Sequence, residues 1–311
     1  MELSVPFRMT PGLSRIPQDH RWLTPTAPGS RHQREKLAVL SRFRSQSLLC
    51  DAGFDPQPAL AAVLEAVSRD HPQDFVWDGQ TLICPKQAIR LDGHQVQQLS
   101  SATYGLGDEV LRCVQSLEQP WRLAGLLSLC IEEDLAIVQS SDSRLRWMAV
   151  ALPSRWAPED KIGKTFAEVH EPVAEAQHLR HNGLALMKMV CGSPALARSV
   201  WSISPEPWLH AHPARLDPEG WHKGSESPIP DRAWMRMEDQ SFLPLPSRGQ
   251  AVFAIRVRVE PLAQAVDSVL VAQRLHDSIA SMSEEVLRYK GLLAVREPLL
   301  RWLRWRCDSN P

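Results

Sequence analysis

Apolar residues recur with two different periods along the chain, and each period predicts a type of element. Helical spacing is clear in two early segments, Arg31–Leu49 and Gln57–Ser68. Two short apolar runs then flank an Asp-Gly pair within Phe75–Cys84, which is a typical β-hairpin signal. A short helix is predicted at Glu109–Leu117. The opening residues, Met1–Ser30, are rich in proline and polar side chains and predict an irregular arm that packs over the domain.

The middle of the chain carries short apolar runs that predict successive strands: Trp121–Ile131, Leu135–Gln139, Arg146–Leu152, Arg198–Ser204, Ala233–Phe242 and Gln250–Val259. A helical region that extends to about Met189 separates the first three runs from the last three. Pro205–Pro230 is dense in Pro, Trp, His and Gly and predicts a long ordered loop or partial lid. Leu262–Leu287 predicts a long amphipathic helix, and Pro298 is expected to interrupt a second helix between Ser283 and Cys307.

This order of helices, strands, a helical insertion and returning strands indicates an α+β fold with a largely antiparallel sheet. We expect three parts that together form one compact unit. Residues 1–120 form an arm, helices and a hairpin that pack on the core, residues 121–262 form the core, and residues 263–311 form a C-terminal helical extension.

Composition narrows the classes of function. The chain has 311 residues with 35 basic and 36 acidic side chains, and its formal net charge of −1 argues against general binding of nucleic acid or of anionic membranes. The chain contains no apolar run of the roughly 18 residues that a membrane span needs, and the N-terminus lacks the pattern of a secretory signal, so the cytoplasm is the expected location. The six cysteines include no Cys-x-x-Cys pair, which argues against a zinc ribbon or a ferredoxin-type cluster in this chain.

The most informative stretch is Leu152–Val173, LPSRWAPEDKIGKTFAEVHEPV. It predicts a strand end and then a helix that starts near Pro158 and ends near His170, because Pro172 disfavours helical geometry before it. His170 lies beside an apolar stripe, where a neutral imidazole suits a haem iron or another metal. The alternative is a hydrogen-bonded core histidine, which is the commoner case. Five further histidines compete for the ligand role: His178, His181, His210, His212 and His222.

The run LPSRW-x-P-x-x-KIGK-x-x-x-x-VHEPV resembles the signature of the haem-dependent oxidative N-demethylase family. Further runs that resemble the family, in the same order, lie between Pro6 and about Leu262: PFRMTPGL, EEDLAIV, RSVWSI, LHAHP, MRMEDQSFLPLP and AVFAIRVRVEPL. The resemblance implies a haem b held by His170 in a PAS-like fold, with O₂ and a small amine meeting on the distal side. It also implies that electrons come from a separate reductase subunit that carries FMN, a 2Fe-2S cluster and the site for NADPH.

The resemblance also implies roles for residues around the haem. Arg236, Glu238 and Gln240 alternate along a predicted strand, so they share one face and Asp239 lies on the other. Such a face is usually solvated, but the family pattern places it in the haem pocket. Arg236 is then expected to neutralise a propionate or polarise bound O₂, and Glu238 to hold a cationic amine. Further cofactor contacts are expected from Arg256, Arg258, Trp201 and His210, with exposed strand arginines as the alternative for the first two.

Two departures from the family pattern concern the substrate. Asp239 stands where the family has arginine, and Val200 stands where it has asparagine. These changes predict a more apolar and more negative pocket, which favours an amine larger than dimethylamine. The predicted function is a haem-dependent monooxygenase that removes an N-methyl group from a small secondary or tertiary amine. The alternatives are a haem-based PAS gas or redox sensor and a haem-free structural homologue.

Overall fold

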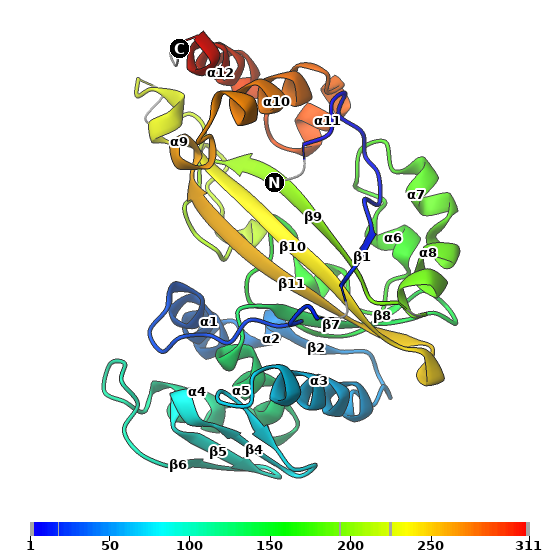
Figure 1. The fold of residues 1–311 in the computed structure, drawn as a ribbon, viewed down its shortest axis with the longest axis vertical. Helices are drawn as coiled ribbons and strands as arrows, with labels where there is room; N and C mark the ends of the chain where they lie inside the picture. The colour runs from blue at the N-terminus through cyan, green and yellow to red at the C-terminus, as the bar shows by residue number, and fades with distance from the viewer. Residues whose placement is uncertain (1–2, 18, 193, 224–225, 309–311) are drawn as a thin grey trace.

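A computed structural model of the protein describes residues 3–17, 19–192, 194–223 and 226–308. Within these residues the chain forms an α+β fold with two antiparallel sheets, which confirms the predicted α+β class and the antiparallel pairing. The larger sheet has seven strands in the order β1-β9-β10-β11-β7-β8-β2, and a separate four-stranded sheet has the order β3-β4-β5-β6. Figure 1 shows the smaller sheet at one end of the molecule and the C-terminal helices at the other.

Three long strands form the centre of the larger sheet: β9 (Leu196–Ser204), β10 (Trp234–Leu245) and β11 (Gln250–Pro261). The strands beyond them are β7 (Asp134–Gln139), β8 (Leu145–Ala149), β2 (Leu48–Cys50) and, at the opposite edge, β1 (Ser14–Arg15). In this register Glu238 on β10 lies opposite Val200 on β9 and Val257 on β11. The sheet therefore takes its two edge strands from the first 120 residues, while the three-part division of the chain stays a prediction.

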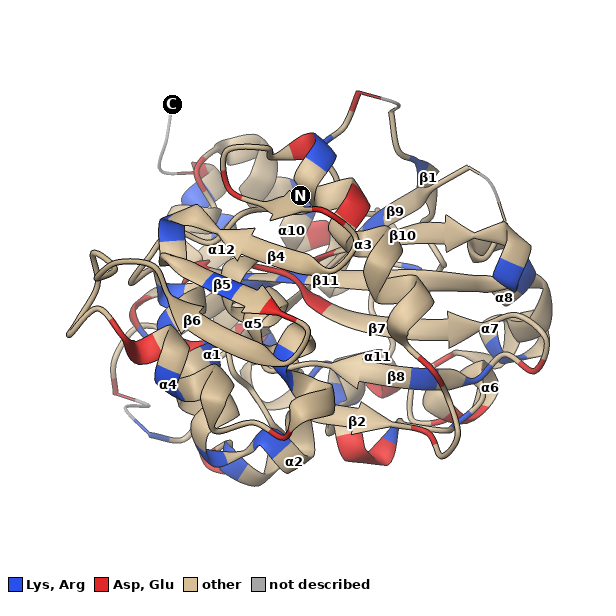
Figure 2. Ribbon diagram, turned by 90° about the horizontal axis from the view of Figure 1, so that it is seen from below, with Lys and Arg blue, Asp and Glu red and all other residues tan. Residues whose placement is uncertain are grey.

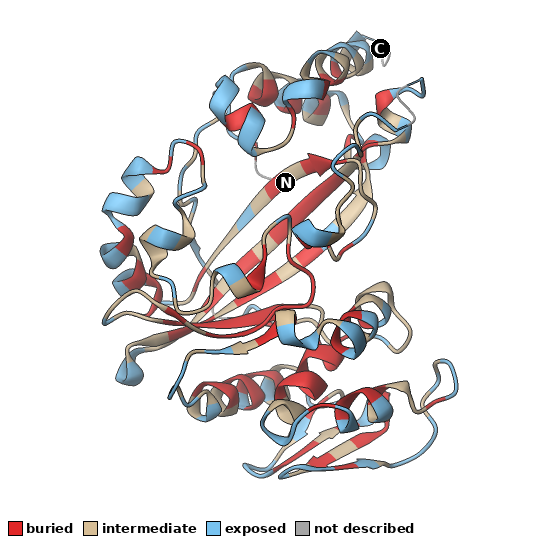
Figure 3. Cartoon of the chain, turned by 180° about the vertical axis from the view of Figure 1, so that it is seen from behind, coloured by how far each residue is buried: buried red, intermediate tan, exposed pale blue. Residues whose placement is uncertain are grey.

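The N-terminal part packs helices against the smaller sheet and one face of the larger one. Its elements are α1 (Arg31–Arg42), α2 (Arg44–Ser47), α3 (Gln57–Asp70), β3 (Val76–Trp77), β4 (Thr81–Cys84), β5 (Ile89–Asp92), β6 (Gln95–Gln98), α4 (Glu109–Gln115) and α5 (Arg122–Cys130). The strand predicted at Trp121–Ile131 is wrong, because this run forms α5. Every residue of α5 from Ala124 onward is buried, as the red helix in Figure 3 illustrates, so no polar face marks the helical period.

A helical insertion between β8 and β9 covers one face of the long strands. It contains α6 (Phe166–Val169), α7 (Gln177–His181) and α8 (Gly183–Val190). The predicted helix end near His170 is confirmed, but the predicted start near Pro158 is wrong. Pro158–Asp160 forms only a 3-10 turn, Gly163 adopts a positive φ of 73°, and the Thr165 and Glu168 side chains then form a capping box that starts α6.

The C-terminal part is a group of short helices and not the single long helix predicted at Leu262–Leu287. The helices are α9 (Leu262–Ala265), α10 (Val269–Ala280), α11 (Glu284–Tyr289) and α12 (Arg296–Asp308). The side chains of Ser268 and Ser283 accept hydrogen bonds from backbone amides and so start α10 and α11 as separate helices. Pro298 lies in the first turn of α12, where the missing N–H costs no internal hydrogen bond.

The N-terminal arm runs from beside α11 down to β1, as the blue segment of Figure 1 shows. The backbone amide of Phe7 donates to Ser281 Oγ at 2.9 Å, and Leu3 is buried in the core that the C-terminal helices form. Basic and acidic residues are interspersed over most of the ribbon in Figure 2. None of the helices in the described residues combines the length and the apolar composition that crossing a bilayer requires.

Candidate functional site

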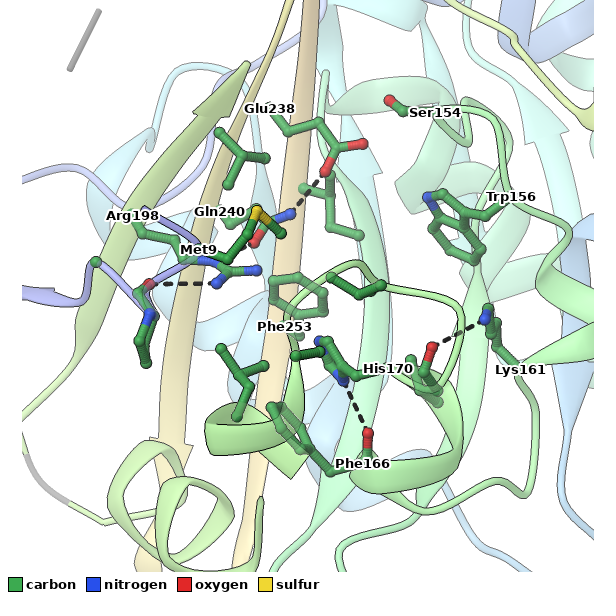
Figure 4. A pocket seen from close by; sticks show the side chains of 18 of the residues that line it. Met9, Ser154, Trp156, Lys161, Phe166, His170, Arg198, Glu238, Gln240 and Phe253 are labelled. Atoms are coloured by element: carbon green, nitrogen blue, oxygen red, sulfur yellow. Dashed lines mark hydrogen bonds between the residues drawn. The ribbon is translucent and has the colours of Figure 1, made fainter. Parts of the chain in front are cut away.

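A cavity of about 660 Å³ lies between the long strands and the helical insertion (Figure 4). Small-molecule and cofactor sites typically have volumes of about 300–1,000 Å³. Apolar side chains from α6, α8 and β11 line much of its wall, among them Phe166, Met187 and Phe253. The N-terminal arm closes one side with Phe7–Leu13, and the segment after β8 contributes Ser154 and Trp156. The cavity therefore joins segments that are far apart in the sequence.

His170 faces this cavity from the C-terminal end of α6. Its Nδ1 lies 2.8 Å from the carbonyl oxygen of Phe166, which can only accept, so Nδ1 carries the proton and Nε2 keeps its lone pair. The imidazole also stacks on the Phe166 ring with the centroids 4.0 Å apart. Burial lowers the pKa of His170 to about 4, and the nearby cations Arg198 and Lys161 act in the same direction. The imidazole is therefore neutral near pH 7 and presents Nε2 as a metal ligand would.

Arg236, Glu238 and Gln240 all lie on the cavity side of β10, and all three are buried. The intervening Met237 and Asp239 line a second cavity of about 410 Å³ on the other side of the strand. The alternation along this strand therefore places the three predicted residues on the same face as His170, and Asp239 outside that cavity.

A chain of hydrogen bonds connects the arm to the polar strand face. Arg198 on β9 donates from Nη1 to the carbonyl oxygen of Pro11 at 3.2 Å and from Nε to Gln240 Oε1 at 2.7 Å. Gln240 Nε2 in turn donates to Glu238 Oε2 at 2.6 Å. The hydrogen bonds from Arg198 to Gln240 and from Gln240 to Glu238 orient the Glu238 carboxylate at the cavity wall. Figure 4 shows this carboxylate pointing toward the interior of the cavity.

Arg236 has a different environment from the one expected from the sequence. Its guanidinium donates to Ser154 Oγ at 2.7 Å, to the carbonyl oxygen of Trp208 at 2.8 Å, to that of Pro153 at 3.2 Å and to that of Leu209. Burial lowers its pKa to about 10, so it stays protonated near neutral pH. These contacts use most of its donors to join the segment after β8 to the segment after β9.

Lys290, at the C-terminal end of α11, also reaches the cavity. Its Nζ donates to the carbonyl oxygen of Trp201 at 2.7 Å and lies 4.7 Å from the centroid of the Trp201 ring and 5.2 Å from that of Phe7. Burial lowers the pKa of Lys290 to about 8, although the negative charge of Glu238 opposes this shift. Lys290 is therefore mostly protonated at pH 7.

Three predicted cofactor contacts lie away from His170. Arg256 and Arg258 line the second cavity, where they pair with Glu132 at 2.6 Å and with Asp239 at 2.8 Å. They stand on the strand face opposite to the polar residues of β10, so they are not placed to contact a group bound at His170. The imidazole of His210 is engaged by the carbonyl oxygen of Ala151 at 2.6 Å and by Arg215 at 2.7 Å, outside the cavity lining. Trp201 does border the main cavity.

Sequence reasoning missed Arg198 and Lys290, and it gave no role to Met9 or to the lysines of the KIGK run, Lys161 and Lys164. The resemblance of the PFRMTPGL and KIGK runs to the family could have indicated that the N-terminal arm and these two lysines belong to the site. Nothing local in the sequence marks Lys290, because only the packing of α11 brings it to the cavity.

Among the described residues, no three His, Cys, Asp or Glu side chains come together as ligands for a metal ion. A haem needs only one axial side chain, because its macrocycle supplies the other ligands to the iron. His170, with a fixed ring and an Nε2 that faces a cavity of this size, fits that requirement.

The model of one protein family matches residues 34–300, which is most of the chain. The description of that family is haem-dependent oxidative N-demethylase, alpha subunit-like.

Proposed function

Because the chain belongs to the haem-dependent oxidative N-demethylase alpha subunit-like family, we propose that its main cavity binds haem b with His170 as the axial ligand. We further propose that it removes an N-methyl group from a small secondary or tertiary amine with O₂, in a fold of the PAS type. The observation that carries the proposal is the His170 imidazole, which is neutral, anchored through Nδ1 and open to the cavity at Nε2.

The bound haem would supply the activation of O₂. The overall reaction takes an N-methyl amine, O₂, two electrons and two protons to the demethylated amine, formaldehyde and water. The chain's own contribution is to place the reactants and exclude water. Glu238 would hold the ammonium form of the amine, and Arg198 would fix that carboxylate through Gln240. Arg236 would stabilise the cavity wall through its hydrogen bonds to the backbone carbonyl oxygens of Trp208 and Pro153.

The cations that face the cavity are the proposed partners of the haem propionates, in place of Arg256 and Arg258. Lys161 is one, since its Nζ lies at the wall and donates to the carbonyl oxygen of Val169 at 2.9 Å. Arg155 and Lys164 also border the cavity. An ammonium or guanidinium group in this position compensates a carboxylate that the cavity removes from water.

The electrons would come from a partner protein. An alpha subunit implies other subunits, and we propose that one of them is a reductase that carries FMN, a 2Fe-2S cluster and the site for NADPH. The cysteines of this chain are all free thiols, four of them buried, which fits a reducing compartment such as the cytoplasm.

The test is a spectrum followed by an assay. Haem-loaded protein is expected to show a Soret band that moves on addition of dithionite and then of CO, and a reductase with NADPH is expected to drive release of formaldehyde from an N-methyl amine. A spectrum without a Soret band would favour the haem-free homologue. A Soret band that responds to CO or to redox state without formaldehyde release from any amine would favour the sensor.

A further inference from the structure

The wall of the main cavity is strongly cationic, although the whole chain is close to neutral. Among the residues that the structure describes, two acidic ones border it, Asp160 and Glu238. The basic residues that border it are Arg8, Arg155, Lys161, Lys164, Arg198, Arg236 and Lys290. A haem would bring two carboxylates, so an excess of positive charge would remain when it is bound. The cavity is therefore more positive than its sequence predicted, because Asp239 lies on the other strand face.

An excess of like charge in a partly enclosed cavity raises the affinity for ligands of the opposite sign. A simple alkylammonium ion pairs with Glu238 alone, while Arg198 and Arg236 from the same sheet and Lys290 from the end of α11 add positive charge to the same cavity. Glu238 lies within electrostatic reach of two of these cations, because its carboxylate raises the pKa of both Arg198 and Lys290 against the larger effect of burial. A ligand with a negative group in addition to its amine would match both signs.

Lys290 is held in a defined position for such a group. The T-shaped pair of Phe7 and Trp201, with centroids 6.2 Å apart, lies against its ammonium, and the carbonyl oxygen of Trp201 accepts one of its three N–H groups. The next residue is also fixed, because the carbonyl oxygen of Gly291 accepts from Trp221 Nε1 at 2.9 Å. The remaining N–H groups of Lys290 are available to an acceptor in the cavity.

Lys290 and Glu238 have opposite charges and border the same cavity. Within the part of the chain that the structure describes, the ion pairs closer than 4.0 Å do not include one between these two residues. An ammonium and a carboxylate that face one space without contacting each other are complementary to a zwitterion whose charges have the reverse order.

On the basis of the proposed function, we propose that the substrate is an N-methyl amino acid, with its ammonium group at Glu238 and its carboxylate at Lys290. Such a substrate differs from a simple alkylamine by one carboxylate. It makes Lys290 the residue that determines specificity, while Glu238 serves amines with and without the acid group.

The test compares two ligands of the same shape. N,N-dimethylglycine and its primary amide differ only in the charge of the acid group, and calorimetry on the haem-loaded full-length protein measures the affinity for each. We expect dimethylglycine to bind at least about tenfold more tightly, the usual effect of a charge-assisted hydrogen bond. Equal affinities, or tighter binding of the amide, would overturn the inference.

Variants then locate the contact. Lys290→Met is expected to lower the affinity for dimethylglycine by about tenfold and to lower the affinity for the amide much less. Lys290→Arg is expected to retain part of the affinity for dimethylglycine that Lys290→Met loses. Lys188→Met, at an exposed position on α8, is the matched control and should change neither affinity. A uniform loss for both ligands in Lys290→Met, with Lys290→Arg no better, would assign Lys290 a structural role only and overturn its part in specificity.

The same experiment keeps this inference separate from the proposed function, because calorimetry measures binding without turnover. Selective binding of dimethylglycine without formaldehyde release would contradict the demethylase and support the zwitterion site. Formaldehyde release from simple amines, with no preference for dimethylglycine, would support the demethylase and overturn the zwitterion site.

Discussion

Phe166 holds the imidazole of His170 in two ways, through its carbonyl oxygen at 2.8 Å from Nδ1 and through a ring that stacks 4.0 Å away, centroid to centroid. The two residues are one helical turn apart on α6 and its C-terminal end. A ligand that donates its second ring nitrogen to a carbonyl has a fixed tautomer and orientation. The backbone of a four-residue helix thus defines where Nε2 points.

His170→Ala is expected to abolish stoichiometric haem binding and to lower the free energy of unfolding of the haem-free protein by less than about 2 kcal/mol. The modest effect on stability follows because the half-buried ring makes one hydrogen bond, to a backbone carbonyl, and one ring stack, on Phe166. The pyridine haemochrome assay and the Soret band measure haem content. His178→Ala, at an exposed position on α7, is the control and should bind haem like the wild type. Normal haem content in His170→Ala would move the ligand role to another histidine.

Gly183→Ala is expected to weaken haem binding without a direct contact to the haem. A Cβ atom at Gly183 would lie 2.8 Å from a carbon of the Phe166 ring, so the ring that supports His170 must move. Haem affinity, measured by competition with apomyoglobin, should fall by about tenfold or more if the ring orientation matters. The substitution Leu184→Ala changes an exposed residue of the same helix and serves as the control. Unchanged affinity in Gly183→Ala would show that Phe166 can shift without disturbing Nε2.

The parts of this site that sequence could predict are those that local rules determine. The period of two along β10 placed Arg236, Glu238 and Gln240 on one face, and Pro172 marked the end of α6 beside His170. Both inferences need only neighbours in the sequence.

The rest depends on distant contacts or on ambiguous patterns. The run that forms α5 is apolar on nearly all sides, and its lack of β-branched residues before Ile131 is a local sign against a strand. Lys290 belongs to the site because α11 packs beside β9, a contact between residues 89 apart in sequence. Arg256 and Arg258 alternate as Arg236 and Glu238 do, but the pairing register turns them to the opposite face.

Arg236→Met is expected to lower the free energy of unfolding by about 2–5 kcal/mol, in haem-free and haem-loaded protein alike. The substitution leaves the carbonyl oxygens of Pro153, Trp208 and Leu209 without their donor in a buried place. Urea unfolding measures the change. Arg258→Met removes a 43% exposed arginine from the same sheet and should cost less than about 1 kcal/mol. A loss of haem binding without a loss of stability in Arg236→Met would instead support contact with a propionate.

Lys36→Met is expected to destabilise the protein by about 3–5 kcal/mol, because it leaves the Asp134 carboxylate buried without its partner. Lys36 Nζ lies 3.1 Å from Asp134 Oδ1 and also donates to the carbonyl oxygens of Ile131 and Glu133, and both charged side chains are almost completely buried. Urea unfolding measures the change. The comparison is Lys86→Met, whose 52% exposed side chain pairs with Asp74 and should contribute less than about 1 kcal/mol. Similar losses in both variants would mean that burial does not set the cost at Lys36.

The stability of the protein without added amine should depend on pH through Lys290. Its pKa in the folded protein is about 8, below the ordinary value of 10.5, because burial outweighs the attraction of Glu238. Between about pH 8 and pH 10.5 the Lys290 side chain therefore binds more protons in the unfolded chain than in the folded protein. The contribution of Lys290 to the free energy of unfolding consequently rises with pH in this range. Urea unfolding at about pH 7 and about pH 9.5 should show wild type gaining about 1–3 kcal/mol relative to Lys290→Met, while Lys188→Met follows the wild type. The difference in the free energy of unfolding between wild type and Lys290→Met could instead stay constant with pH or change in the opposite direction. Either result would show that the ammonium of Lys290 is not desolvated in the folded protein.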